Sequence, residues 1–427
     1  MGDMQGERVE VEITGVAHGG IFVARHEGRV IFVSDAIPGE RVVAQITDDA
    51  KSSFWRADTV AVLDASPHRR PHVWDSAALE REPGQRAGGA EFGHIRLEHQ
   101  RELKRQVIVD SMKRMAKLDV TVDVAGLPSG ETPGALAGEA LADEDGTGWR
   151  TRLRLHVGED GTPGPYVARS HRVIPVTDLP LAVPEARQVA PLGQKFVGAE
   201  FIDIVVPSTG NPFVLVDDPA SGPAKQSNDI VERVGDRDFR LDVRGFWQVH
   251  RHAAQTLTTA VQQAIDESLF DARAANLDLY GGVGLLAAAV GDRFGQAVRI
   301  TSVESDAGAT DHAAENLVDW AGATAVTARV ERYLRQVGTE ARGADRSRLR
   351  AATVVLDPPR AGAGKAVVSE LVRLEPAHIV YVACDPVALA RDVALFAAQG
   401  YEMSRLVAFD LFPNTHHVEA VATLVRR

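Results

Sequence analysis

Apolar and polar residues alternate over short runs in the first part of the chain, and this pattern predicts a small β domain. The runs lie at residues 9–13, 20–24, 30–33, 41–46 and 57–63, with glycine or proline between several of them. Five short strands over residues 8–64 favour a barrel of the OB type, a fold that often binds nucleic acid. Any other small β-barrel fits the pattern equally well.

A helical pattern and an acidic stretch follow the predicted barrel. Residues 97–118 have helical periodicity and, with their lead-in, an excess of basic residues, which is most often a solvated helix face. Residues 119–148 contain acids, glycine and alanine but no lysine or arginine. We expect a flexible loop there and assign it no chemistry.

A row of arginines marks residues 149–157. Alternation places Arg150, Arg152 and Arg154 on one face of a predicted strand. Three like charges on one strand face are unfavourable unless they meet phosphate groups or acids. We therefore interpret this face as an RNA contact, and residues 197–246 as further β-rich sequence.

From residue 245 onwards the pattern alternates between strands and helices. Short apolar runs at 275–280, 298–303, 353–356, 378–383 and 418–424 are mostly separated by helix-like stretches. Such alternation is typical of a parallel, doubly wound sheet. The sequence thus predicts an α/β protein with three parts: an OB-like β-barrel at 1–66, a connecting helix with a β-rich central region at 67–245, and a Rossmann-like domain at 246–427.

Composition narrows the class of protein. The chain has 427 residues, of which 44% are hydrophobic and 25% charged, as in ordinary soluble proteins. The net charge of −12 argues against a protein that coats nucleic acid non-specifically, but it permits local basic patches. We expect no membrane contact and a cytoplasmic location, because the chain has neither a run of 18 apolar residues nor an N-terminal signal pattern.

A glycine-rich loop supplies the first candidate site. Residues 277–284 carry three glycines, Gly282 and Gly284 among them, between a predicted strand and an alanine-rich helix. Such a loop lets a ligand approach the backbone at a helix N-terminus, and Glu304 at the end of the next strand can hold ribose hydroxyls. The spacing fits S-adenosylmethionine better than a dinucleotide, although an ordinary strand–helix turn gives the same pattern.

Three further candidates lie at the ends of later strands. Asp357 and Arg360 are fixed by two prolines between them, and Cys384 leaves the next strand at the same edge of the sheet. A single cysteine excludes a disulfide within the chain, and it is either a buried apolar residue or a nucleophile whose pKa Arg360 helps to lower.

Glu419 lies in an apolar strand, where a carboxyl group is uncommon unless paired or catalytic. His416 and His417 lack a third ligand nearby, so we expect no metal site.

Together these motifs resemble the S-adenosylmethionine-dependent RNA uracil-5-methyltransferases with an N-terminal TRAM domain, which modify tRNA or 23S rRNA. The stretches that carry the resemblance are Phe246-Trp-Gln248, 278–284, 357–360, 384–386 with 389–392, and 412–419, and at the front of the chain 36–42 with Ser66-Pro67. The resemblance implies that Cys384 adds to uracil C6, that Arg360 stabilises the enolate and that Glu419 is the base. It also implies that Gln248, Tyr280, Glu304 and Asp357 contact S-adenosylmethionine.

The chain departs from this family at two places. Many members bind an iron–sulfur cluster through cysteines, but Ala87 and Ala90 stand in two of those positions, so we expect no iron–sulfur cluster. Arg329-Val330 stands where an acidic residue or asparagine is expected. We expect 23S rRNA rather than tRNA as the substrate. The alternatives are an RNA-binding protein with a non-catalytic methyltransferase fold, and a nucleotide-dependent oxidoreductase on the same sheet.

Overall fold

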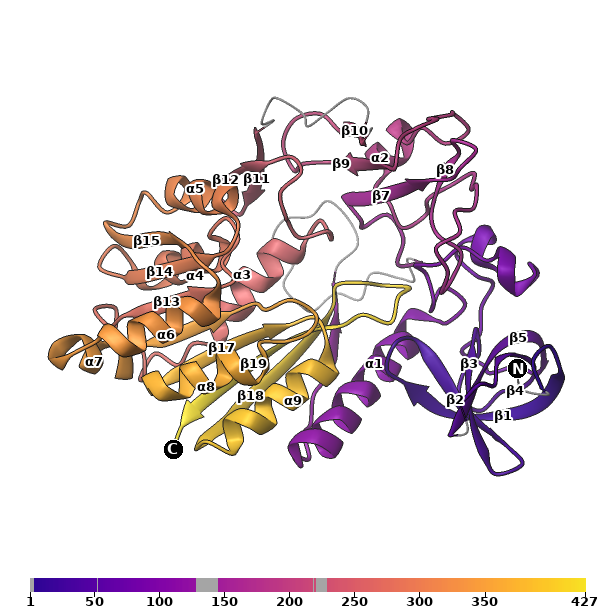
Figure 1. The fold of residues 1–427 in the computed structure, drawn as a ribbon, viewed down its shortest axis with the longest axis horizontal. Helices are drawn as coiled ribbons and strands as arrows, with labels where there is room; N and C mark the ends of the chain where they lie inside the picture. The colour runs from indigo at the N-terminus through magenta and orange to yellow at the C-terminus, as the bar shows by residue number, and fades with distance from the viewer. Residues whose placement is uncertain (1–3, 52, 128–144, 218, 220–228) are drawn as a thin grey trace.

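A closed five-stranded barrel forms the N-terminal part of the protein (Figure 1). A computed structural model describes residues 4–51, 53–127, 145–217, 219 and 229–427. In β1, Val9, Val11 and Ile13 point into the barrel while the residues between them are exposed, as the alternation predicts. The strand order is β1-β2-β3-β5-β4, which confirms the predicted barrel. Its strands are β1 (Arg8–Ala17), β2 (Ile21–His26), β3 (Arg29–Ser34), β4 (Arg41–Asp48) and β5 (Phe54–Asp64).

The central region contains a long helix, a small sheet and a hairpin. Helix α1 (Leu97–Ser111) continues into a π-helical turn, η3 (Met112–Ala116), and contacts both the barrel and the C-terminal domain. The four-stranded sheet has the order β10-β9-β7-β8, and β11 pairs with β12 alone. The remaining elements are η1 (Asp75–Ala77), η2 (Pro83–Gln85), β7 (Arg152–Val157), β8 (Pro163–Gly164), α2 (Pro184–Val189), β9 (Phe201–Val205), β10 (Phe213–Asp217), β11 (Asp229–Val234) and β12 (Arg237–Asp242).

An eight-stranded sheet carries the C-terminal domain, with the order β15-β14-β13-β16-β17-β19-β18-β6. It is mixed rather than wholly parallel, because β19 runs antiparallel to both β17 and β18. Its last strand, β6, comes from the acidic stretch, where we expected only a flexible loop; residues 128–144 of that stretch lie outside the described residues. The strands are β6 (Val124–Gly126), β13 (Asn276–Leu279), β14 (Arg299–Glu304), β15 (Gly322–Thr327), β16 (Thr353–Leu356), β17 (His378–Ala383), β18 (Tyr401–Asp410) and β19 (Glu419–Arg426).

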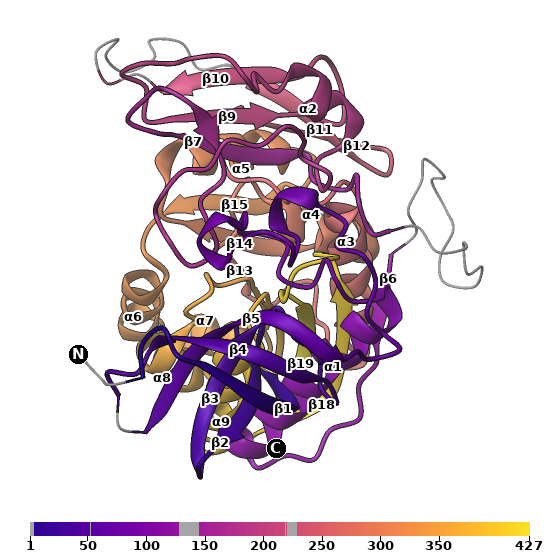
Figure 2. The same ribbon diagram turned by 90° about the vertical axis from the view of Figure 1, so that its right-hand side faces the viewer.

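Helices cover both faces of this sheet, so its central strands are buried on both sides (Figure 2). Leu356 and Tyr381 pack into one apolar layer with α6, α8 and α9, while their neighbours Val355 and Val380 pack into the other with α3 and α4. This explains why the strands are continuous apolar runs in the sequence. The helices are α3 (Ala253–Ala264), α4 (Leu285–Phe294), α5 (Ala307–Asn316), α6 (Val330–Glu340), α7 (Gly343–Arg350), α8 (Gly364–Leu374) and α9 (Pro386–Ala397).

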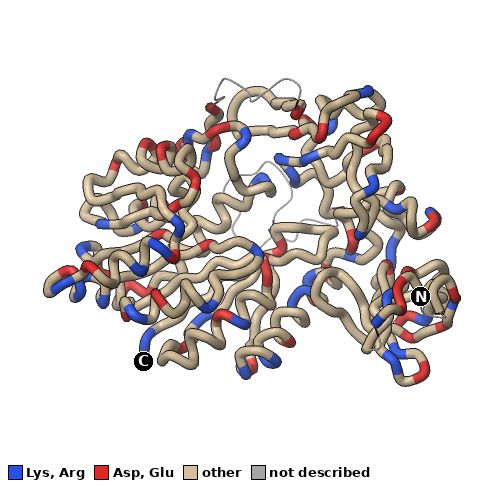
Figure 3. Tube along the Cα trace, in the orientation of Figure 1, with Lys and Arg blue, Asp and Glu red and all other residues tan. Residues whose placement is uncertain are grey.

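Charged residues of both signs are interspersed along the whole trace (Figure 3). Within the described residues, no helix is long and apolar enough to cross a membrane.

Helix α1 buries polar side chains, although its charges predict a solvated helix. Lys104 is 1% exposed, and its Nζ lies 2.5 Å from Asp410 Oδ1 and 3.0 Å from the Phe412 carbonyl oxygen. One turn earlier, the side chain of Gln100 exchanges hydrogen bonds with Asn414, whose φ of 64° is left-handed. Helix α1 therefore holds the segment 411–418 that leads into β19.

We predict that Lys104→Ala destabilises the protein by about 3–5 kcal/mol, because it leaves the buried Asp410 carboxylate without its cation. Urea denaturation followed by circular dichroism measures this. The control is Lys113→Ala in η3, whose partner Asp119 is 85% exposed, and we expect a loss below about 1 kcal/mol. Equal losses in the two variants would contradict the assignment.

Candidate active site

The carboxyl ends of the central strands meet at one edge of the large sheet. Leu279 of β13 is paired with Leu356 of β16, and Leu356 with Tyr381 of β17. The antiparallel pair Ala383–Ala420 then sets the register between β17 and β19. As a result Cys384, which follows β17, lies opposite Glu419, which begins β19. The register thus brings together the sequence-predicted nucleophile and base.

The glycine loop joins β13 to α4 at this same edge. A Cβ on Gly281 would lie 2.0 Å from Ser302 Oγ, so the close approach of the backbone here requires glycine. Gly284, the residue before α4, has a φ of 90°, and the Gly282 N–H donates to Glu304 Oε2 at 3.2 Å. The loop and the end of β14 therefore form one structural unit, as expected for a nucleotide-type ligand site.

Three carboxyl groups, which we call the carboxyl cluster, lie near this edge: Asp278 and Glu419 are buried, and Asp357 is half-buried. Burial raises the pKa of Asp278 to about 7, and Glu304 adds to the shift. Burial and the neighbouring Asp278 raise the pKa of Asp357 to about 7. Burial and Asp357 hold the pKa of Glu419 well above its ordinary value. The cluster is therefore partly protonated at neutral pH when no ligand balances its charge.

The thiol of Cys384 is half-buried and shares this environment. Burial, followed by Glu419 and Asp357, raises its pKa to about 12. Arg360 acts in the opposite direction but is outweighed. The expectation that Arg360 lowers this pKa is therefore not met, because burial and the nearby carboxyl groups together outweigh the one guanidinium.

Two arginines lie close enough at this edge for their charges to repel. Burial lowers the pKa of Arg150, and the charge of Arg360 lowers it further. Arg150 donates a hydrogen bond to the Arg152 carbonyl oxygen, and neither Arg150 nor Arg360 has an acidic partner within ion-pair distance among the described residues. Such a pair of cations suits an anion or an electron-rich oxygen.

The other two arginines of the predicted row have internal partners. Arg152 donates to the carbonyl oxygens of Val243 and Gly245 and lies 3.5 Å from Glu232. Arg154 forms a two-pronged pair with Asp203, with nitrogen–oxygen distances of 2.7 and 2.8 Å. The strand β7 begins only at Arg152, so the three side chains do not share one environment.

The remaining predicted residues flank the edge. Tyr280 follows β13 with a left-handed φ of 60°, and Gln248 is half-buried before α3. His416 lies 3.5 Å from Glu91, while burial lowers the pKa of His417 to about 3. Among the described residues, no group of three or more histidine, cysteine or acidic side chains is arranged to hold a metal ion.

Comparisons with known proteins bear on the family of this chain and on its fold. Residues 234–427 match the family described as tRNA (uracil-5-)-methyltransferase, and residues 2–58 match the TRAM domain. An RNA methyltransferase from Streptomyces avermitilis is 38% identical over 98% of both chains, and one from Streptomyces coelicolor is 36% identical over 98% of this chain and 93% of its own.

The chain belongs to the RNA uracil-5-methyltransferase family. Its fold is also that of a solved relative, the Pyrococcus abyssi tRNA (uracil-54, C5)-methyltransferase in complex with S-adenosyl-L-homocysteine. The two share a TM-score of 0.67 and 20% identity, over 99% of this chain and 100% of the other. The barrel is the TRAM domain of this family member.

The stretch around Ala87 and Ala90 is held by apolar packing and by one buried arginine. Ala87 and Ala90 are 4% and 2% exposed and lie in an apolar cluster with Trp74 and Trp149. Arg86 is 3% exposed and donates to Asp35 Oδ2 at 2.7 Å and to three carbonyl oxygens. Apolar packing thus holds the stretch within the central region, and the Arg86 guanidinium connects it to Asp35 and Thr59 of the TRAM domain.

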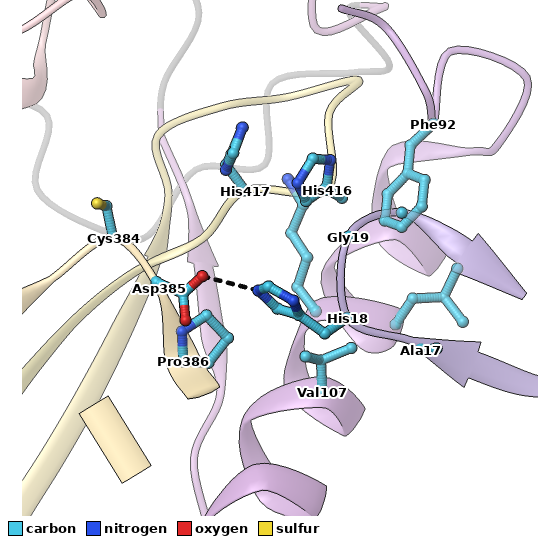
Figure 4. Close-up of a pocket in the computed structure, with 13 residues that line it drawn as sticks. Ala17, His18, Gly19, Phe92, Val107, Cys384, Asp385, Pro386, His416 and His417 are labelled. Carbon is cyan, nitrogen blue, oxygen red and sulfur yellow. Dashed lines mark hydrogen bonds and ion pairs between the residues drawn. The ribbon is translucent and has the colours of Figure 1, made fainter. Parts of the chain in front are cut away.

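Sequence reasoning missed two residues that adjoin the site. Asp385 follows Cys384, and its Oδ2 lies 2.8 Å from Nε2 of His18 in the TRAM domain (Figure 4). Glu91 pairs with His416 from a segment that looks irregular in sequence. Only Asp385 has a signal in the local sequence, because the Asp-Pro pair at 385–386 is typical of a helix start.

We predict that iodoacetamide alkylates Cys384 slowly at pH 8 and faster as the pH rises, because the thiolate is the reactive form. Asp357→Asn removes a charge that raises the thiol pKa, and we expect alkylation about threefold faster, equal to about half a pKa unit. Intact-protein mass spectrometry measures both rates, since Cys384 is the only cysteine. Asp311→Asn on the exposed surface of α5 should match the wild type; an unchanged rate in Asp357→Asn would contradict this account of the site.

Proposed function

We propose that this protein methylates carbon 5 of uracil in RNA with S-adenosylmethionine as the methyl donor. The observation that carries the proposal is the register that places the thiol of Cys384 opposite the buried carboxyl group of Glu419. The glycine loop lies at the same edge of the sheet. Family membership and the ligand of the Pyrococcus abyssi enzyme support the same reaction.

The residues at the edge fit such a methyl donor. The backbone at Gly282 and the carboxylate of Glu304 form the ribose side of the site, and we assign Gln248 and Tyr280 to the same ligand. When bound, S-adenosylmethionine supplies a methyl group on a positively charged sulfur. Because burial and mutual repulsion raise the pKa of Asp357, a cation beside it is favourable.

The chemistry divides between two side chains. Uracil C5 becomes nucleophilic when the Cys384 thiolate bonds to C6 and the displaced electron pair moves to O4 as an enolate. C5 then takes the methyl group as the enolate oxygen returns its electron pair, and the electron pair of the broken carbon–sulfur bond stays on sulfur, which leaves as the thioether S-adenosylhomocysteine. The Glu419 carboxylate removes the C5 proton, the C5–H electron pair re-forms the C5–C6 double bond, and the thiolate leaves.

Cationic groups around the thiol have matching roles. We assign Arg360 as the donor to the enolate oxygen, and Arg150 beside it as a second contact for the uracil or its phosphate. The target uracil must leave the RNA stack to reach this edge. The TRAM domain supplies further RNA contacts. Arg152 and Arg154 take part only where RNA displaces their internal partners.

We predict that Cys384→Ala abolishes both methylation and covalent RNA adducts, whereas Glu419→Gln forms an adduct that is released slowly because its C5 proton stays in place. Denaturing gels of labelled RNA with protein show the adduct, and tritium transfer from labelled S-adenosylmethionine shows turnover. Retained turnover in Cys384→Ala would contradict the nucleophile. Adduct release at the wild-type rate in Glu419→Gln would assign the base to another group.

The RNA class is decided by nucleoside mass spectrometry on separated tRNA and 23S rRNA from cells with and without the gene. Sequence analysis favours 23S rRNA, whereas the Pyrococcus abyssi relative acts on tRNA. Loss of 5-methyluridine from one pool names the substrate. No change in either pool, together with no S-adenosylmethionine binding, would support an RNA-binding protein without catalysis.

We predict that affinity for S-adenosylmethionine rises with pH through about 7 and then levels off. The pKa of Asp357 is about 7 in the free protein, and a bound cation favours its ionised form, so binding releases a proton. Isothermal titration calorimetry at several pH values measures this. S-adenosylhomocysteine, which lacks the positive sulfur, should show a smaller slope, and equal slopes for the two ligands would contradict the placement of Asp357.

A further inference from the structure

The turn between β1 and β2 of the TRAM domain lies against the catalytic edge, although the two are far apart in the sequence. His18 in this turn points toward Asp385, the residue after Cys384 (Figure 4). The distance from His18 Nε2 to Asp385 Oδ2 is 2.8 Å, and the side chains are 46% and 20% exposed. The hydrogen bond to Asp385 raises the pKa of His18, which favours the charged pair.

Asp385 is held from two sides. Its Oδ1 accepts hydrogen bonds from the N–H groups of Val387 and Ala388 at 3.0 and 2.8 Å and so caps α9. Its Oδ2 faces His18. Helix α9 and the TRAM domain thus fix the backbone immediately after Cys384.

The same turn also contacts the segment that leads to Glu419. Gly20 has a φ of 73°, and a Cβ built on it would lie 2.9 Å from Cβ of His416. No larger residue fits without moving one of the two segments. One TRAM turn therefore touches both chain segments that carry the proposed nucleophile and base.

We propose that this turn positions the catalytic edge: His18 is a positioning residue that holds Cys384 in place through Asp385, and Gly20 allows the turn to close on His416. The inference rests on the proposed role of Cys384 as nucleophile. It gives the TRAM domain a part in the chemical step besides any contact with RNA. His18 itself touches Asp385 and not the reacting atoms.

The test separates positioning from RNA binding. Adduct formation is measured with S-adenosylmethionine and saturating 5-fluorouridine-containing tRNA or 23S rRNA transcripts, in which fluorine at C5 prevents release. RNA affinity is measured separately by filter binding. For His18→Ala we expect adduct formation about tenfold slower, because the thiol leaves its attack geometry, with affinity changed less than about twofold. His18→Gln, which keeps a donor near the position of Nε2, should recover most of the rate.

Matched controls come from the same barrel. Gly20→Ala should slow adduct formation like His18→Ala, while Gly28→Ala, with a similar φ of 80° and no atom within 4 Å of the added Cβ, should not. His26→Ala on β2 controls for loss of a TRAM histidine. The comparison of the two glycine variants separates the effect of the clash with His416 from the effect of backbone strain at a positive φ.

The outcomes distinguish the two proposals. Equal adduct rates in the wild type and His18→Ala would overturn the positioning role alone. A loss of RNA affinity as large as the loss of rate would make the turn an RNA contact and also overturn it. If the wild type forms no adduct, the role of Cys384 fails and the inference fails with it.

Discussion

Burying several carboxyl groups together at one edge of a sheet is the constraint on which this structure depends. Burial and neighbouring carboxyl groups raise the pKa values of Asp278, Asp357 and Glu419. Such a cluster destabilises the fold. It persists because the strands beneath it are apolar on both faces and covered by helices on both sides. The arrangement is understandable as a site made for a cationic ligand.

The surrounding elements keep this edge in register from three directions. Pairing of β17 with β19 sets Cys384 opposite Glu419. Helix α1 fixes the segment before Glu419 through the buried pair of Lys104 with Asp410 and through hydrogen bonds to Asn414. The TRAM domain reaches the residue after Cys384. Parts of the chain that lie far apart in the sequence therefore meet at the edge that carries Cys384 and Glu419.

Local patterns were enough to predict the strands of the barrel, the glycine loop and the strand-end residues, because alternation and turn chemistry act over a few neighbouring positions. They could not show that Lys104 is buried, since a lysine in a mixed-charge helix has the same local pattern whether it meets water or a distant aspartate. For the same reason the partner of His18, 367 residues away, has no local signal. Strand β6 is three residues long and lies in an acidic stretch, so only its pairing with β18 reveals it.

Charge explains how an acidic protein can act selectively on RNA. The chain carries a net charge of −12, and most arginines of the central region are paired with acids, so long-range attraction for phosphate is weak. Arg150 and Arg360 lie close together near the edge that carries Cys384, and in the described part of the chain neither has an acidic partner within ion-pair distance. In the proposed reaction this positive charge lies where the uracil arrives, and RNA that does not place a flipped base there gains little. Selectivity then arises from the fit of one nucleotide rather than from overall affinity.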